Sequence, residues 1–233
     1  MTDNSVRRMT ALGGAAIAGQ LLFVGGWLVV GMVEGDGYSA GRHDVSDLGA
    51  LTAHHATASR LTEGIGGALT IAFAVLVLRP CLRSAGRSGV VGAWLVAASL
   101  PAFDTMSDAF FRLDCRAADA GCTAAQATAS WHAKAHLLCF GAAALATVVA
   151  PFVLSRAMRR VDGWQDLAGP ARTFGIVVIA ALAVTGLSTG TALQGWTQRG
   201  AILLVACGIS SLAWRVLRLE SRPLRAARLV AGR

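Results

Sequence analysis

Six separate segments of this chain are apolar over about 20 residues each, the length that crosses a bilayer as a helix. They cover residues 11–33, 60–79, 89–113, 133–154, 173–193 and 200–217. Hydrophobic residues make up 55% of the chain and charged residues only 15%. Backbone groups in lipid must be bonded within their own segment, and no segment alternates as barrel strands do. Each segment is therefore predicted to be a helix.

The pattern predicts an all-α fold, a six-transmembrane-helix bundle, with three parts along the chain. Residues 1–10 form a cytoplasmic N-terminal segment, residues 11–217 the transmembrane domain, and residues 218–233 a basic cytoplasmic tail. Arg7 and Arg8 before the first apolar segment are typical of a signal peptide. That segment, however, is too long and has no Ala-x-Ala cleavage site at its end, so we expect it to be retained as the first helix.

Basic residues are concentrated in alternate connections, and this sets the expected orientation. Fifteen of the 21 Lys and Arg residues lie near the two termini and in the connections around residues 79–87 and 156–172. By the positive-inside rule these parts face the cytoplasm, and the loops 34–59, 114–131 and 194–199 face outward. The expected location is the plasma membrane, with a polar site that opens to the outer face.

The net charge of +8 predicts contact with anionic lipid and no nucleic-acid partner. Each Lys or Arg beside the cytoplasmic leaflet gains about 1 kcal/mol from anionic lipid. The arginines of residues 215–233 are not interleaved with aromatic side chains that would stack on bases. Membrane lipids are therefore the expected partners, and the chain is expected to be a monomer or a homodimer.

The five cysteines fall into two groups. Cys81, Cys139 and Cys207 lie in or beside apolar segments and are expected to be packing residues. Cys115 and Cys122 share one outward loop, where an oxidising compartment favours a disulfide between them. The alternatives are two reduced thiols, or a metal bound by Cys115.

Two carboxylates and two imidazoles are placed where they can meet at one end of a helical hairpin. Asp104 and Asp108 are one helical turn apart in the third apolar segment, and His132 and His136 are one turn apart at the start of the fourth. Charges at membrane depth cost at least about 2.5–3.5 kcal/mol on insertion scales, so those present usually have a partner or a function. We expect the long outward loop 34–59 to fold back over this end of the bundle.

The histidine spacing allows a metal site. His132 and His136 on one helical face can bind one ion, such as Zn²⁺, and Asp108 would supply a third ligand and leave a position for water. The ion would bring the pKa of that water near neutrality, and Asp104 and Asp47 would then handle protons. The residues expected to orient or contact an apolar or lipid substrate are Ser46, Asp114, His43, Asp44, Glu63, Trp131 and Gln194.

Three interpretations of the cluster stay open on the sequence alone. In the first, the protein is a membrane-embedded enzyme, either a metal-dependent hydrolase or a metal-free acid–base catalyst such as an isomerase or cyclase, with a lipid or another apolar substrate. In the second, Asp108 and His136 form a buried ion pair that ties the hairpin together, and the protein is structural. In the third, the protein transports a proton, a cation or a small solute.

Short motifs on the outward side resemble a known family. They are Ser46-Asp47-Leu48-Gly49-Ala50, Phe111-Arg112-Leu113-Asp114 and the histidine-bearing start of the fourth segment. Over residues 12–215 the chain resembles the six-span membrane family catalogued as domain of unknown function 998 (DUF998). The resemblance implies an architecture and no activity. A role shared across that family would rest on Asp47, Asp114 and one histidine.

Overall fold

The computed structural model describes residues 3–35 and 37–231, and within them every regular element is a helix, as predicted. The longer helices are α1 (Asp3–Val33), α2 (Ala56–Phe73), α4 (Arg87–Ala97), α7 (Trp131–Met158), α8 (Ala168–Leu187) and α9 (Gln194–Ala231). The shorter elements are η1 (Val45–Gly49), η2 (Ala74–Leu78), α3 (Arg79–Cys81), η3 (Arg83–Ala85), η4 (Leu100–Asp104), α5 (Thr105–Ser107), α6 (Ala124–Ala127) and η5 (Gln165–Leu167). The predicted tail, residues 218–233, continues α9, and its last two residues lie outside the described part.

Five helices of the described chain are long and apolar enough to cross a membrane on their own. They are Arg7–Val33, Ala56–Cys81, Trp131–Met158, Gln165–Leu187 and Gln194–Leu219. A sixth span is formed by Arg87–Ala97 and Leu100–Ser107 when this pair, bent by 41°, is counted as one. The prediction of a helical membrane bundle is therefore confirmed, with one of its spans broken.

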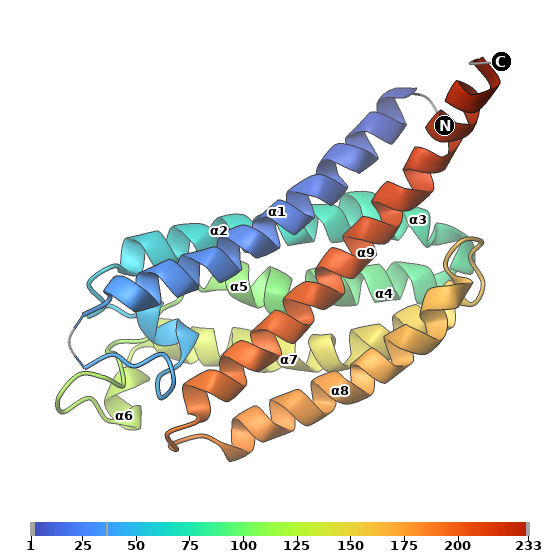
Figure 1. Cartoon of the computed structure of the whole chain (residues 1–233). Coiled ribbons are helices and arrows are strands. Elements are labelled where there is room, and N and C mark those ends of the chain that lie inside the picture. Colours follow the sequence, from blue (N-terminus) through green and yellow to red (C-terminus); the bar gives the residue numbers. More distant parts are fainter. Residues whose placement is uncertain (1–2, 36, 232–233) are drawn as a thin grey trace.

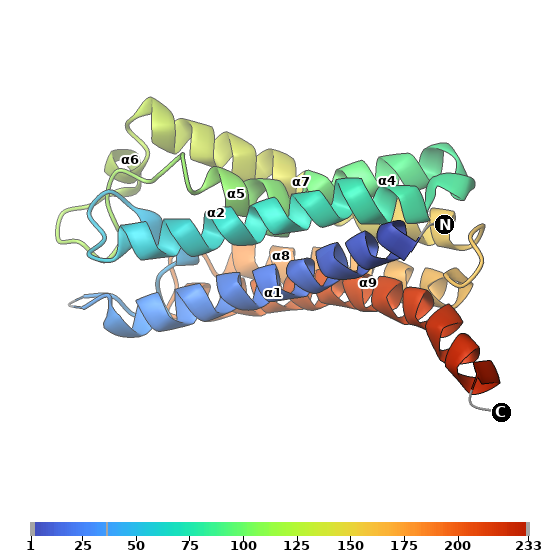
Figure 2. The same cartoon turned by 90° about the horizontal axis from the view of Figure 1, so that it is seen from above.

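The spans form a closed ring in which each packs on the next (Figures 1 and 2). α1 packs on α2, α2 on η4 and α5, α4 on α7, α7 on α8, and α8 on α9. α9 then packs on α1, so the first and last helices are neighbours. α1 begins and α9 ends at the same end of the ring (Figure 1), as an even number of spans requires. We call the opposite end, which carries residues 34–55, 108–130 and 188–193, the capped end.

The third span breaks immediately before Leu100. Helices usually end before the residue that precedes a proline, and Pro101 has no N–H to donate. Side chains from other spans bond the freed backbone groups. The Leu100 N–H donates to Thr147 Oγ1 at 2.8 Å, and Gln20 Nε2 donates to the Pro101 carbonyl at 3.4 Å. The prediction of one continuous helix over residues 89–113 is therefore wrong.

The connection between the last two spans also differs from the prediction. The sequence predicts a span over 173–193 followed by an outward loop over 194–199. In the structure α8 ends at Leu187 and α9 begins at Gln194. Between them Gly190 has a φ of 78°, a left-handed conformation that favours glycine and ends helices. The turn therefore comes earlier, and residues 194–199 are the first turns of α9.

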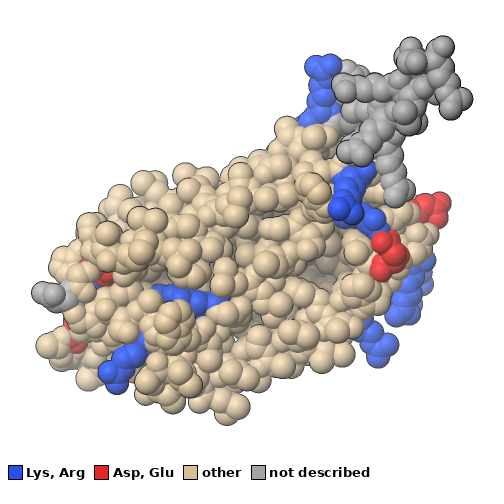
Figure 3. Space-filling view, viewed as in Figure 1, with Lys and Arg blue, Asp and Glu red and all other residues tan. Residues whose placement is uncertain are grey.

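The surface of the bundle suits contact with lipid. On the face seen in Figure 3, most Lys, Arg, Asp and Glu residues lie toward the two ends, and most of the surface between them belongs to other residues. Large apolar side chains point outward from several spans, among them Leu21, Leu138, Leu145 and Leu187. An apolar belt between charged ends is typical of transmembrane helices. The chain is therefore a multi-pass membrane protein, while the side of the membrane that each end faces stays a prediction.

The predicted disulfide is present at the capped end. Cys115 and Cys122 are bonded, with their Cα atoms 6.2 Å apart, and the loop they close lies between α5 and α6. Cys81, Cys139 and Cys207 are free thiols. The small loop beside the mouth of the bundle is thus held in one shape by a covalent bond.

Replacing both Cys115 and Cys122 with serine should lower the free energy of unfolding by about 2 kcal/mol, because the unfolded chain regains the freedom of the closed loop. For a chain of this size that corresponds to a melting temperature lower by roughly 4–8 °C. Thermal unfolding of the purified protein in detergent measures it, with Cys207→Ser as the control that removes an exposed free thiol. Equal melting temperatures for the double variant and the wild type would contradict the expectation.

Candidate functional site

A cavity of about 440 Å³ lies inside the ring at the capped end. Its wall includes residues from all six spans and from the capping loops. The ionisable residues that line it are Asp44, Asp47, Glu63, Asp104, Asp108 and His136. None of the described lining residues is Lys or Arg. We call this space the acidic cavity.

Asp108 and His136 meet across the hairpin formed by the third and fourth spans. Their Oδ1 and Nδ1 atoms are 2.8 Å apart, which is hydrogen-bond distance. Asp108 lies one helical turn after Asp104, whose carbonyl accepts its N–H at 2.9 Å. His136 lies in the second turn of α7, which Ser130 caps by accepting the N–H of Ala133. The predicted juxtaposition of an acid and an imidazole from these two spans is confirmed.

The Asp108–His136 pair leaves one ring nitrogen for chemistry. Because Nδ1 of His136 is engaged by Asp108, Nε2 is the nitrogen able to exchange a proton. A carboxylate in this position fixes the tautomer of the imidazole and stabilises its charged form. The arrangement is therefore suited to general acid–base work.

Two further carboxyl groups of the spans lie deep in the acidic cavity. Asp104 is 8% exposed, and its Oδ1 has no hydrogen-bond partner in the described structure. Glu63 is 3% exposed, and its Oε1 accepts the hydroxyl of Ser59 at 2.9 Å. A buried polar atom without a partner costs free energy, so the Asp104 oxygen is placed for a proton, a cation or a donor group of a ligand.

The capping loop adds two acidic residues from η1 and its N-cap. Asp47 Oδ1 accepts the N–H of Ala117 at 3.2 Å, whereas its Oδ2 is buried without a partner among the described atoms. Burial raises the pKa of Asp47 from 3.8 to about 6, and the negative charges of Asp44 and Asp119 act in the same direction. Burial also raises the pKa of Asp44, whose Oδ2 accepts Gln194 Nε2 at 2.8 Å.

The raised pKa of Asp47 predicts that Asp47→Asn stabilises the protein at neutral pH. Below pH 4 the folded wild type carries Asp47 as a neutral acid and loses nothing. As the pH rises from 4 to 6, the Asp47 carboxyl ionises in the unfolded chain before it ionises in the folded protein. The free energy of unfolding of the wild type therefore falls by about 3 kcal/mol over this range. Asp47→Asn should therefore melt roughly 6–12 °C above the wild type at pH 7.5 and close to it at pH 4. Thermal unfolding at both pH values measures the gap, and a gap of the same size at pH 4 would contradict a titration of Asp47.

An ion pair between Glu34 and Arg116 joins the loop that follows α1 to the loop that follows α5. Glu34, at the junction of α1 with its loop, is 0% exposed and accepts Arg116 Nη1 at 2.8 Å. It also accepts the backbone N–H groups of His54 at 2.8 Å and His55 at 3.2 Å. Arg116 in turn donates from Nε to Asp119 Oδ1 at 2.9 Å. One buried carboxylate therefore ties together the two loops that cover the cavity.

Arg199 of α9 also holds the loop that follows α1. Its Nη1 donates to the carbonyls of Ala40 at 2.6 Å and His43 at 2.8 Å, and its Nη2 donates to the hydroxyl of Tyr38. The guanidinium also lies over the ring of Trp27, 5.3 Å from its centroid. Burial raises the pKa of Tyr38 to about 12, so its hydroxyl stays neutral. The predicted folding of the loop over the bundle mouth is confirmed.

Several residues predicted for the site lie outside the acidic cavity. His132 stacks on Trp131 with ring centroids 3.7 Å apart, and Trp131 is largely exposed. Asp114 Oδ2 accepts the N–H of Ser130, which lowers the pKa of Asp114. His43 Nδ1 accepts a backbone N–H, and Gln194 reaches the cavity only through Asp44. Ser46, by contrast, lines the cavity.

The metal ligands predicted from the sequence do not come together as a set. His136 and Asp108 face each other, but His132 is held against Trp131 outside the cavity. In the described part of the chain, no group of three or more His, Cys, Asp or Glu residues is arranged to hold a metal ion. The zinc mechanism therefore stays a prediction from the sequence.

The fold and the cavity define a helical, multi-pass membrane protein with an acidic chamber near one end of its bundle. The family model described as protein of unknown function (DUF998) matches residues 17–217, so the chain belongs to that family, as its motifs indicate. A search of curated proteins found no match, and a search of solved structures found none either.

Proposed function

We propose that the protein is a membrane-embedded acid–base catalyst that acts on a lipid-like molecule held in the acidic cavity. The observation that carries the proposal is the hydrogen bond between Asp108 and His136 on the wall of that cavity. The volume of about 440 Å³ is within the range of roughly 300–1,000 Å³ usual for small-molecule sites. Apolar residues such as Phe23, Phe140 and Ile202 complete the wall, which suits a substrate drawn from the membrane.

In the proposed reaction a proton leaves one substrate atom and another proton arrives at a second atom. His136 accepts the first proton at Nε2, and Asp108 stabilises the imidazolium that forms. Asp104, in its acid form, donates the second proton from the neighbouring turn. The two groups then exchange a proton to return to their starting state, so the step is an isomerisation that needs no co-reactant.

The unpaired oxygens support chemistry over a purely structural role. An ion pair that only ties two helices together needs no further acidic group beside it. Asp104 and Asp47 both line the acidic cavity, and each keeps one buried oxygen without a described partner. Such atoms reduce stability, and functional sites are where proteins tolerate that cost.

Transport is a second candidate function, favoured by the break in the third span. Discontinuous helices at mid-membrane depth are typical of the substrate sites of transporters, and Leu100 and Pro101 at the break line the acidic cavity. A transporter would release a trapped solute from sealed proteoliposomes, whereas the proposed catalyst changes the chemical structure of a lipid.

Lipid analysis of cells with and without the protein tests the proposal. Mass spectrometry of membrane extracts should show one lipid class converted to an isomer or product when the wild type is expressed. The same extracts with Asp108→Asn, expressed to an equal level, should show the unconverted lipid. Identical lipid profiles in all three strains would overturn the proposal.

A further inference from the structure

A second cavity lies beside the acidic cavity, in the half of the bundle nearer the termini. It has a volume of about 360 Å³ and lies between α4, α7, α8 and α9. Apolar side chains dominate its wall, among them Val96, Pro151, Leu154, Phe174, Leu204 and Leu212. None of its described lining residues is charged. We call it the apolar cavity.

The two cavities adjoin at the break in the third span. Val205 of α9 lines both of them. Ser99 lines the apolar cavity, while the next residue, Leu100, lines the acidic one. The acidic cavity at the capped end and the apolar cavity nearer the termini are therefore neighbours, an order that matches the two parts of an amphiphile.

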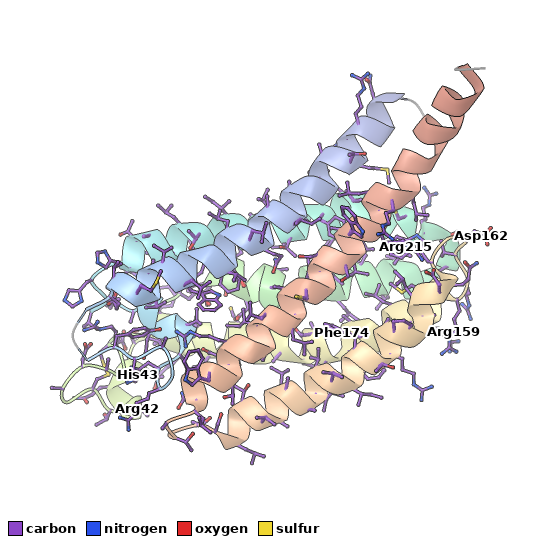
Figure 4. The ribbon with its side chains drawn as sticks, viewed as in Figure 1. Arg42, His43, Arg159, Asp162, Phe174 and Arg215 are labelled. Carbon is purple, nitrogen blue, oxygen red and sulfur yellow. A yellow bond between two sulfur atoms is a disulfide. The ribbon has the colours of Figure 1, made fainter. Side chains whose placement is uncertain are left out.

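The apolar cavity is reached from the side of the bundle. α8 and α9 diverge toward the termini (Figure 1), and the surface between them is hollowed in the space-filling view (Figure 3). Phe174 extends from α8 toward α9 (Figure 4), where its ring lies so close to Gly208 that a Cβ there would meet it at 2.5 Å. A hydrocarbon chain from the surrounding lipid can enter by this gap without crossing the capped end.

The charge of the acidic cavity selects the head group. Its ionisable lining consists of carboxyl groups and one imidazole, and none of its described lining residues is Lys or Arg. The buried, unpartnered oxygens of Asp104 and Asp47 call for hydrogen-bond donors. An ammonium group carries three donors and a positive charge, so it meets both needs, whereas the described residues offer no ligand set for a metal ion.

We infer that the site takes an amphiphile with a primary amine head group and a single hydrocarbon chain. The ammonium lies in the acidic cavity near Asp104, and the chain passes Val205 into the apolar cavity between α7, α8 and α9. This inference rests on the proposed function, because it names the class of substrate for the same site. Amine binding and lipid conversion are measured separately, so each can fail without the other.

Photo-crosslinking with matched probes tests the inference. The purified protein in phosphatidylcholine nanodiscs is exposed to tetradecylamine that carries a diazirine in its chain, and to the tetradecanol analogue with the same diazirine. The amine should label the protein at least tenfold more strongly than the alcohol, and mapped adducts should fall on residues of the apolar cavity such as Leu204. Equal labelling by the two probes, or adducts only on lipid-facing residues, would overturn the inference.

Two matched substitutions on α8 test the position of the chain. Ala171 lines the apolar cavity, whereas Ala180 on the same helix is exposed on the outside of the bundle. Ala171→Trp should reduce labelling by the tetradecylamine probe at least fivefold. An excess of hexylamine, whose short chain does not reach the apolar cavity, should still compete with the labelling that remains. Ala180→Trp should leave both unchanged. Loss of labelling in both variants, or in neither, would place the chain elsewhere and overturn the inference.

The head-group contact is tested by Asp104→Asn, with Asp47→Asn as a second variant in case the first does not fold. Each replacement puts an amide in place of the carboxyl group and keeps its shape, so amine labelling should fall toward the level of the alcohol probe. If both variants fold and both are labelled as strongly as the wild type, these carboxyl groups do not hold the amine. A lipid profile that depends on His136 would survive that result, and the acid–base function would then stand without an amine substrate.

Discussion

Replacing His136 with glutamine should lower the rate of lipid conversion by about 10²–10⁴-fold, the usual contribution of a positioned general acid or base. The glutamine amide can keep a hydrogen bond to Asp108 but has no group that gains or loses a proton near neutral pH. The packing of α7 on the third span should therefore be kept while the proton transfer is lost. The measurement is the initial rate of conversion of the lipid that the extracts identify, in proteoliposomes with equal amounts of folded protein.

His132→Gln is the matched control for that experiment. His132 is one turn earlier on α7, and its ring stacks on Trp131 outside the acidic cavity. If His136 is the histidine that transfers the proton and His132 takes no part, this variant should keep its rate within about threefold. Equal losses in the two histidine variants, together with inhibition by a chelator, would favour the metal site predicted from the sequence over the proposed mechanism.

Replacing Arg116 with methionine should destabilise the protein by about 3–5 kcal/mol, the second large effect expected here. The substitution keeps an unbranched side chain of similar length, but it leaves Glu34 charged and 0% exposed, with only two backbone donors in the described structure. Removing one partner of a buried ion pair has this cost because the other charge is then unbalanced. The melting temperature should fall by roughly 6–20 °C.

A double variant separates the lost charge balance from lost packing. Glu34→Gln together with Arg116→Met removes both charges, and it should recover most of the stability that Arg116→Met loses. Arg42→Gln serves as the control, because Arg42 is an exposed residue of the same capped end (Figure 4) and should change stability by less than about 0.5 kcal/mol. A double variant no more stable than Arg116→Met would show that the pair acts through packing.

The membrane fold was predictable because it depends on segment length and composition. Six long apolar segments allow only helices in lipid, and five of them are found as single long helices. The broken span was missed because its overall hydropathy is that of a continuous helix. The signal was Pro101 after Ser99 and Leu100, since proline inside an apolar segment marks a kink or a break.

The sequence predicts the pairing of Asp108 with His136, but it does not predict the side-chain contacts that hold the loops over the cavity. Asp108 and His136 follow from the spacing of residues on two consecutive helices. Glu34 and Arg116 are 82 residues apart, and Arg199 bonds a carbonyl 159 residues earlier, so no local pattern joins them. The carbonyl partners of Arg199 add no sequence signal, since every residue carries one. A charged residue next to a span, as Glu34 is, also has the ordinary explanation of a solvated helix end.

The ring of helices also has a consequence for biogenesis. The loop after α1 emerges early in translation, yet it is fixed by Arg199 on α9, which is synthesised after α1 to α8. Until α9 enters the membrane and packs on α1, the wall of the chamber is incomplete and its acidic groups face lipid or water. A ribosome stalled before residue 194 would therefore leave a nascent protein that insertion-quality control can recognise by its unshielded carboxyl groups.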